Sequence, residues 1–431
     1  MTTATHTTRP VTVGAMRRWA MLAASVLGAM ATTCAVSGAG FLIPTLHTEE
    51  GLSIAAASTL ATAPTVGLMI SIIPWGAALD RFGERRILLI SLVLTVVATA
   101  AAVAAAAADL GYVALAATLV AGGVVSAATN GASGRIVVGW FPPRRRGTAM
   151  GVRQTAQPLG IGLCAMTIPV LSADHGITVG LVVPLVAAVV ALVAVAACVI
   201  DPPRTATTPG AVAEGENPYR TSRFLPRVHA VSVLLVIPQS TLWTFSSAWL
   251  IVGHHWTPAS AGVVVTVAQF LGAAGRIAAG RWSDVWGSRM RPIRVIAIAA
   301  VVMSALLALA DWVGSPVAVV LMVVATVVTV ADNGLAFTGI AEYAGPRWSG
   351  RALAVQNTGQ FLATAATTPI LGAVIGAAGF PAAFLAMAVA PVIALPLVPS
   401  DPNASDTSRS GGGGHDVRAP GATDGREPQQ P

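Results

Sequence analysis

Four ionisable side chains stand inside long apolar runs of this 431-residue chain: Arg135, Arg153, Arg276 and Asp332. A charge in an apolar environment is costly unless it is paired or solvated, so such residues mark function by default. A guanidinium group binds a carboxylate through two parallel hydrogen bonds, and a buried carboxyl group can carry a proton. The chemistry offered by these residue types is therefore anion binding, proton transfer or ion pairing.

Arg153 opens the stretch RQTAQP at 153–158, where Gln157 lies one helical turn further on the same face. A similar stretch, VQNTGQ at 355–360, carries three more amides about two hundred residues later. We expect Arg153 to be the main charge partner of an anionic or polyhydroxy solute, with snorkelling or gating as the alternative. The candidate substrate-binding residues are Arg153, Gln154, Gln157, Gln356, Asn357, Gln360, Asn130, Asn333, Gln239 and Trp243.

The last two of these residues belong to the stretch PQSTLWTFSSAW at 238–249. It offers a polar and aromatic helix face, and ordinary hydrogen bonding between helices is the alternative interpretation. His229, His254 and His255 stand near the ends of apolar runs and are expected to face solvent.

Motifs for other chemistries are missing from the sequence. It contains no phosphate-binding GxxxxGK[ST] loop, no HExxH and no GxSxG. The three cysteines, Cys34, Cys164 and Cys198, show no CxxC spacing, which argues against a disulfide framework or a metal site. We therefore expect no enzyme activity, no cofactor and no metal.

The composition is that of a membrane protein with many spans. Hydrophobic residues make up 55% of the chain and charged residues only 10%, against about 25% charged residues in soluble domains. A span needs about 20 mainly apolar residues. We predict twelve spans, at 18–44, 53–76, 86–108, 111–138, 148–173, 176–199, 228–252, 258–280, 293–312, 315–340, 351–377 and 380–399.

All 25 basic residues are arginine, and 22 of them fall in loops on one side if the spans alternate. This distribution follows the positive-inside rule and argues against nucleic-acid binding. Both termini are therefore expected in the cytoplasm, in the inner membrane of a bacterium. The predicted parts are an N-terminal segment at 1–17, a six-helix bundle at 18–200, a cytoplasmic linker at 201–227, a second bundle at 228–399 and a disordered tail at 400–431.

The two halves repeat one another. Gly76, Asp80, Gly83 and Arg85 match Gly280, Asp284, Gly287 and Arg289 at an offset of 204, and the segment 147–158 matches 350–361 at an offset of 203. An offset of six spans preserves orientation, so the fold class is all-α with two parallel-repeat six-helix bundles.

The sequence GAALDRFGERR at 76–86 resembles the signature loop between spans two and three of the major facilitator superfamily (MFS). The resemblance covers roughly residues 15–400, and the second copy departs from it by Val285 in place of Arg81. It implies transport by alternating access, with Asp80 contacting the start of span eleven near Gly350 while the cytoplasmic side is closed. The expected gating residues are Gly76, Asp80, Arg81, Gly83, Arg85, Asp284, Arg135, Arg276 and Asp332.

Asp332 has two open interpretations: a gate that pairs with Arg135 or Arg153, which we favour, or a proton carrier. We expect a monomeric transporter in the lipid bilayer that takes up an organic anion or similar polar metabolite together with protons. The alternative is export of amphipathic compounds or drugs. Span five lacks the Gly-Pro-x-x-Gly-Gly pattern that would resemble that of drug antiporters, and this absence weakens the hypothesis of export.

Overall fold

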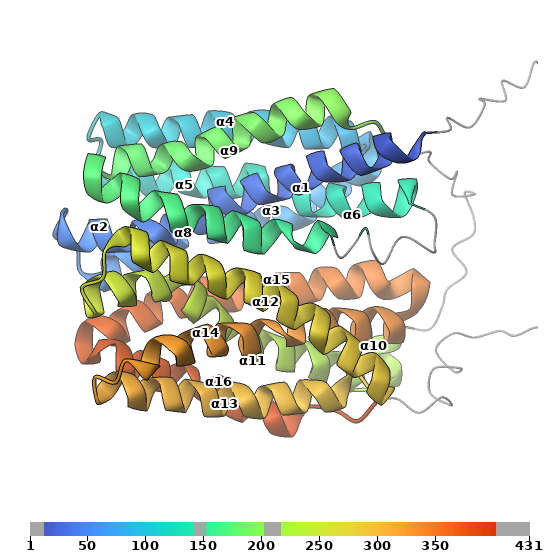
Figure 1. Ribbon diagram of the computed structural model, residues 1–431. Coiled ribbons are helices and arrows are strands. Elements are labelled where there is room, and N and C mark those ends of the chain that lie inside the picture. Colours follow the sequence, from blue (N-terminus) through green and yellow to red (C-terminus); the bar gives the residue numbers. More distant parts are fainter. Residues whose placement is uncertain (1–12, 142–148, 150–151, 202–216, 402–431) are drawn as a thin grey trace, which may run out of the picture.

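The computed structural model describes residues 13–141, 149, 152–201 and 217–401, and the part of the chain that it describes is helical and contains no strand (Figure 1). Residues 1–12 of the predicted N-terminal segment, 202–216 of the linker and the tail from 402 lie outside the described residues. The helices form two bundles, which Figure 1 shows one above the other.

The first bundle contains the helices before the linker. The first crossing consists of α1 (Ala15–Ser37), a 3-10 turn η1 (Gly38–Leu42) and α2 (Ile43–Thr48). The remaining helices are α3 (Ile54–Phe82), α4 (Glu84–Ala107), α5 (Tyr112–Ser126) continued by α6 (Ala128–Trp140), α8 (Ala156–His175) and α9 (Ile177–Cys198).

The second bundle follows a short helix, α10 (Pro218–Thr221). It consists of α11 (Phe224–Ala248) with a π-helical end η2 (Trp249–Gly253), α12 (Pro258–Trp286), α13 (Met290–Trp312), α14 (Val317–Val330), α15 (Asp332–Met387), α16 (Val389–Ala394) and the 3-10 turn η3 (Leu395–Leu397).

Helix α15 is not one straight element. Gly345 (φ 69°) and Gly379 (φ 82°) break it, because both adopt a positive φ that favours glycine. Among the described residues, eleven helical stretches are long and apolar enough to cross a membrane, and the last of them, Gly350–Leu397, has 48 residues. The break at Gly379 divides that stretch in two, so the prediction of twelve spans is confirmed.

The signature motif is more helical than the sequence suggested. We predicted that span two ends at residue 76, but α3 continues to Phe82, and α12 likewise continues to Trp286 beyond the predicted 280. The turn itself is confined to Gly83, whose φ of 94° joins α3 to α4. The reason is that Gly76 and Gly280 interrupt hydrophobicity without breaking helical geometry.

Two aspartates make equivalent contacts in the two bundles. Asp201 Oδ1 accepts the backbone N–H of Arg85 at 2.6 Å, at the start of α4. Asp401 Oδ1 accepts the backbone N–H groups of Arg289 and Met290 at 2.9 and 3.1 Å, at the start of α13. A carboxylate is favourable at a helix N-terminus. In each bundle, an aspartate that follows the last helix therefore binds the start of the third helix, and the internal repeat extends to this contact.

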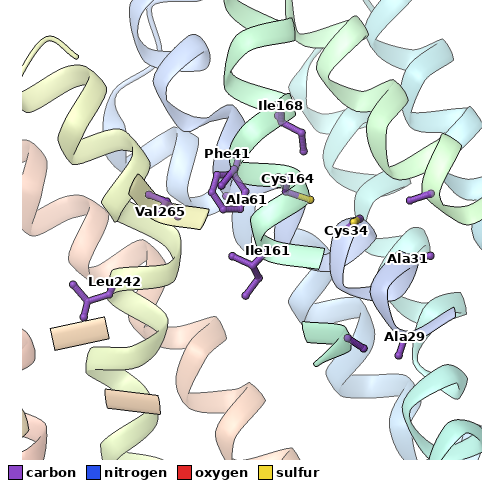
Figure 2. Close-up of a cluster of buried hydrophobic side chains, with 14 of the residues drawn as sticks. Ala29, Ala31, Cys34, Phe41, Ala61, Ile161, Cys164, Ile168, Leu242 and Val265 are labelled. Atoms are coloured by element: carbon purple, nitrogen blue, oxygen red, sulfur yellow. The ribbon is translucent and has the colours of Figure 1, made fainter. Parts of the chain in front are cut away.

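The ends of the molecule differ. The start of α1 and the end of α6 lie at the same end as α10, which we call the α10 end; α2 lies at the opposite, α2 end (Figure 1). One hydrophobic core includes residues of both bundles, among them Leu242 and Val265 of the second, and Figure 2 shows Val265 next to Phe41 of the first. A second core, which includes Phe224 and Val398, contains only residues of the second bundle.

The contacts between bundles lie toward the α2 end. The Thr266 hydroxyl donates to the Gly162 carbonyl at 3.1 Å, joining α12 to α8. A Cβ added at Gly262 would collide with the backbone of Ala165, and one added at Gly372 would collide with Ser58. Toward the α10 end, a Cβ added at Gly76 or Gly350 would meet no atom of the described structure within 4 Å. The bundles are thus packed together most closely at the α2 end.

Candidate functional site

Arg153 and Arg276 lie at the same level on helices of different bundles. Helices α8 and α12 run antiparallel, and Gly162 contacts Thr266. Arg153 precedes Gly162 by nine positions and Arg276 follows Thr266 by ten, which is about 14 and 15 Å toward the α10 end at about 1.5 Å per residue. Each bundle therefore contributes one half-buried guanidinium at this depth.

Arg153 is held on the first bundle by polar side chains. Its Nε donates to the Ser133 hydroxyl of α6 at 2.9 Å, and its Nη1 donates to Gln154 Oε1 at 3.0 Å. The Gln154 side chain is exposed, and Gln157 is half-buried one turn further along. Within this stretch the guanidinium therefore contacts the adjacent amide of Gln154, which the helix-face argument for Gln157 did not predict.

Arg276 occupies a denser environment on the second bundle. Its Nε donates to the Val330 carbonyl at 3.3 Å, and its guanidinium carbon lies 5.9 Å from the centre of the Trp243 ring. Asp332, only 1% exposed, is close enough to Arg276 to interact with it electrostatically. The sequence offered Arg135 and Arg153 as partners for this acid, and the structure places Arg276 beside it.

A continuous chain of amides joins α11 and α15 next to this cluster. Asn333 donates from Nδ2 to Gln239 Oε1 at 2.8 Å and accepts from Gln360 Nε2 at 2.9 Å. Gln360 Nε2 also lies 2.9 Å from the Ser232 hydroxyl oxygen, to which Gln356 Nε2 donates as well. Four amides predicted as substrate-binding residues are therefore brought together, while Asn357 instead donates to the Leu353 carbonyl at 3.0 Å.

Buried polar atoms without a partner lie on α11. Among the described residues, Trp243 Nε1 and the hydroxyl oxygens of Ser246 and Ser247 are buried and make no hydrogen bond. The spacing i, i+3, i+4 puts them on one helix face. An unsatisfied buried polar group costs about 1–3 kcal/mol, so this face is unusual unless a ligand satisfies it.

The predicted gating residues divide between the two bundles. Arg135 Nη1 lies 3.8 Å from Glu84 Oε1, and Arg85 donates from Nη2 to the Ala196 carbonyl at 3.2 Å. The Arg81 side chain is exposed and stacks over Phe82 at 5.3 Å. The side chains of Asp80 and Asn130 lie outside the described part of the structure, so the predicted contact of Asp80 with span eleven does too.

The second copy of the motif forms a charged cluster in the second bundle. Arg289 donates to Asp284 Oδ1 at 2.6 Å and to Glu342 Oε1 at 3.0 Å. The hydrogen bond to Glu342 raises the pKa of Arg289, with Asp284 adding to the effect and burial opposing it. The cluster borders a cavity of about 370 Å³ that also touches Asp401.

One expectation about the histidines is wrong. His229 is 8% exposed, and its two ring nitrogens lie 2.8 Å from Gln356 Oε1 and 3.0 Å from the Tyr219 hydroxyl. Its position at the end of an apolar run gave no sign of these partners, because Gln356 is 127 positions away. His255 is exposed as expected.

Two further groups were missed in the sequence. Ser232 is fully buried between two amides, and its place one turn after His229 would have been the signal. The capping aspartates Asp201 and Asp401 each precede a proline, and this shared Asp-Pro pair was an unused sign of the repeat.

Comparisons with known proteins agree with this architecture. A sequence model of the Major Facilitator Superfamily matches residues 25–368. A protein of Mycobacterium tuberculosis (strain ATCC 25618 / H37Rv), described as an uncharacterized MFS-type transporter, is 46% identical over 390 residues, which cover 90% of this chain and 86% of that protein.

Solved structures of low sequence identity share the fold. The crystal structure of a D-xylose-proton symporter matches with a TM-score of 0.73 at 17% identity, over 89% of this chain and 98% of that one. A bacterial homolog of the human lysosomal transporter Spinster, in an inward-facing and occupied conformation, matches with a TM-score of 0.69 at 16% identity, over 90% and 97%.

Proposed function

Because the chain belongs to the major facilitator superfamily, we propose that it is a secondary transporter that takes up a small organic anion, or a similar polar metabolite, by proton-linked alternating access. The observation that carries the proposal is the placement of Arg153 and Arg276 at one depth on facing helices of the two bundles. An anion held between two guanidinium groups from different bundles would link the bundles directly.

The amide chain and the aromatic face supply the remaining contacts. Half-exposed Asn333 and Gln360 offer polar groups to a solute, and Trp243 offers an unused N–H donor. Together with Gln154 and Gln157 on the first bundle, these residues would bind the oxygen atoms of an anionic or hydroxylated solute. Asn130, Gln239, Gln356 and Asn357 complete the proposed substrate-binding set.

Asp332 is proposed to couple anion and proton. It is buried close enough to Arg276 for the two side chains to interact electrostatically while no solute is bound. A carboxylate that binds Arg276 would weaken this interaction, and Asp332 would then be left as an isolated buried charge unless it takes up a proton. The gating role that the sequence favoured for Asp332 remains compatible, because the same electrostatic interaction would hold α12 near α15.

The contacts between bundles suggest which side is closed. They lie toward the α2 end, while the arginine-rich α10 end is proposed to be cytoplasmic by the positive-inside rule. The structure then corresponds to a state closed toward the outside, and Gly76, Asp80, Arg81, Gly83, Arg85, Arg135 and Asp284 would close the other side. The proposal includes a monomer in the bacterial inner membrane, with the linker, the tail and both termini in the cytoplasm.

Uptake into proteoliposomes tests the proposal. The full chain is reconstituted and offered labelled lactate, pyruvate, succinate and citrate, with D-xylose as a neutral probe, with and without an inside-alkaline pH gradient. We expect accumulation of at least one anion that a protonophore abolishes. Failure to accumulate any anion, combined with expulsion of a preloaded amphipathic dye such as ethidium, would overturn the proposal in favour of export.

A further inference from the structure

The end of the central linker is bound to the second bundle by one aromatic residue. Tyr219 of α10 lies on His229 with ring centroids 5.9 Å apart and planes 17° apart, and it meets Trp348 edge-on at 6.3 Å. The Asn217 side chain accepts the Tyr219 backbone N–H at 3.0 Å, which shapes the short helix. Tyr219 therefore contacts both α11 and α15, the two helices that hold the amide chain.

Hydrogen-bond polarity defines the state of His229. The Oε1 atom of Gln356 can only accept a hydrogen bond, so the proton of the neutral imidazole is on Nδ1 of His229, which donates to it at 2.8 Å. Nε2 of His229 then accepts from the Tyr219 hydroxyl at 3.0 Å, and burial raises the pKa of Tyr219, so that hydroxyl keeps its proton. Gln356 consequently presents its amide N–H to Ser232 rather than its oxygen.

This polarity extends into the proposed transport site. Gln356 and Gln360 both donate to the Ser232 hydroxyl, and Gln360 also donates to Asn333, which donates to Gln239. Turning the Gln356 amide over would set its N–H groups against the Nδ1–H of His229, and the Ser232 hydroxyl would have to donate to Gln356 instead of accepting from it. His229 thus fixes the orientation of the Gln356 amide and the role of the Ser232 hydroxyl, to which Gln360 also donates.

We propose that the end of the linker is docked onto His229 through Tyr219, and that His229 is a positioning residue that sets the orientation of the Gln356 amide and, through it, the role of the Ser232 hydroxyl to which Gln360 of the transport site donates. The positioning part rests on the proposed function, whereas the docking part does not. A linker held in this way fixes where the connection between the bundles leaves the second bundle, and it ties that point to the site.

Docking is tested on the purified full chain without any solute. Nitroxide labels are attached to cysteines introduced by Arg220→Cys on α10 and Arg291→Cys in the first turn of α13, both exposed positions. Cys34 and Cys164 are buried, so only Cys198 needs replacement by serine. We expect a narrow distance distribution that broadens in Tyr219→Ala and stays narrow in the control His255→Ala. A distribution unchanged by Tyr219→Ala would overturn docking.

Positioning is tested by the KM for uptake of whichever labelled carboxylate the reconstituted chain accumulates. His229→Ala should raise KM about tenfold, since a buried amide oxygen loses its donor, with the maximal rate within twofold of the original. His229→Asn keeps a donor at the place of Nδ1 and should restore KM while docking stays broadened. A KM within twofold of the original in His229→Ala, or no recovery with Asn, would overturn positioning.

Two results separate this inference from the proposed function. If no carboxylate is accumulated, the proposed function fails, yet the label distances still decide docking. In that case the midpoint of thermal unfolding decides the role of Nδ1, because His229→Ala should lower it and His229→Asn should recover most of the loss. If His229→Ala does not yield folded protein, Tyr219→Ala still tests docking, and His229→Asn compared with the original chain still tests positioning.

Discussion

The guanidinium carbon of Arg276 lies 5.9 Å from the centre of the Trp243 ring, which joins α12 to α11 beside the buried Asp332. A cation over an indole face is favourable by about 0.5–2 kcal/mol. The contact leaves the Trp243 N–H without a partner. An arginine, an acid and an unused donor thus share one small region of the second bundle.

Replacing Arg153 by glutamine should abolish anion uptake while leaving membrane insertion intact. The glutamine keeps a hydrogen-bonding side chain but removes the charge that a carboxylate needs. Initial rates of labelled carboxylate uptake provide the measurement. The matched control is Arg291→Gln at an exposed position in the first turn of α13, which should leave the rate unchanged. Undiminished uptake by the Arg153 variant would rule out its role.

Asp332→Asn should separate transport from its driving force. Asparagine cannot release or take up a proton, so accumulation driven by the pH gradient should be lost, while exchange of labelled for unlabelled anion across equal concentrations should continue. Comparison of these two assays in the same vesicles is the measurement. If gradient-driven accumulation persists, Asp332 acts only as a gate.

Gly372→Val should shift the protein away from the state closed at the α2 end. A Cβ at Gly372 collides with Ser58 of α3, so the added side chain forces the bundles apart there. The rate at which a small thiol reagent labels a cysteine introduced by Ser58→Cys should rise. Gly376→Val one helical turn away is the control, since a Cβ there meets nothing within 4 Å; equal labelling rates in both variants would contradict the prediction.

Asp401→Ala should destabilise the second bundle by about 1.5–3 kcal/mol, the usual range for hydrogen bonds to a charged group. The carboxylate accepts the backbone N–H groups that begin α13, and these lose their partner. Thermal unfolding in detergent measures the effect. Asp401→Asn should retain most of the stability, and Asp174→Ala, at an exposed position at the end of α8, is the control. A midpoint unchanged by Asp401→Ala would contradict the prediction.

Parts of the candidate site could be predicted because they depend on local patterns. Arg153, Arg276 and Asp332 are conspicuous as charges inside apolar runs. Gln356 and Gln360 have the same spacing along the chain as Arg153 and Gln157 in the other half. The proximity of Asp332 to Arg276 could not be predicted, because the acid and the arginine are on different helices and packing alone decides which guanidinium is near.

The burial of His229 could not be predicted from the sequence either. A histidine near the end of an apolar run indicates an interface with water, since nothing nearby in the sequence offers it a partner. Helix packing instead brings Gln356 to one ring nitrogen and Tyr219 to the other. Burial of a polar side chain depends on partners that come from distant segments.

The amino-acid sequence by itself determined that the chain has twelve apolar spans, that its halves are repeats and that its arginines gather on one side. These properties follow from the length of apolar runs and the cost of moving charge through a bilayer, and both act on each segment separately. Only the tertiary structure decided where the bundles touch, which arginine lies beside Asp332 and how the amides are oriented. Those relationships depend on the register of antiparallel helices, in which a shift of one residue turns each side chain by about 100°.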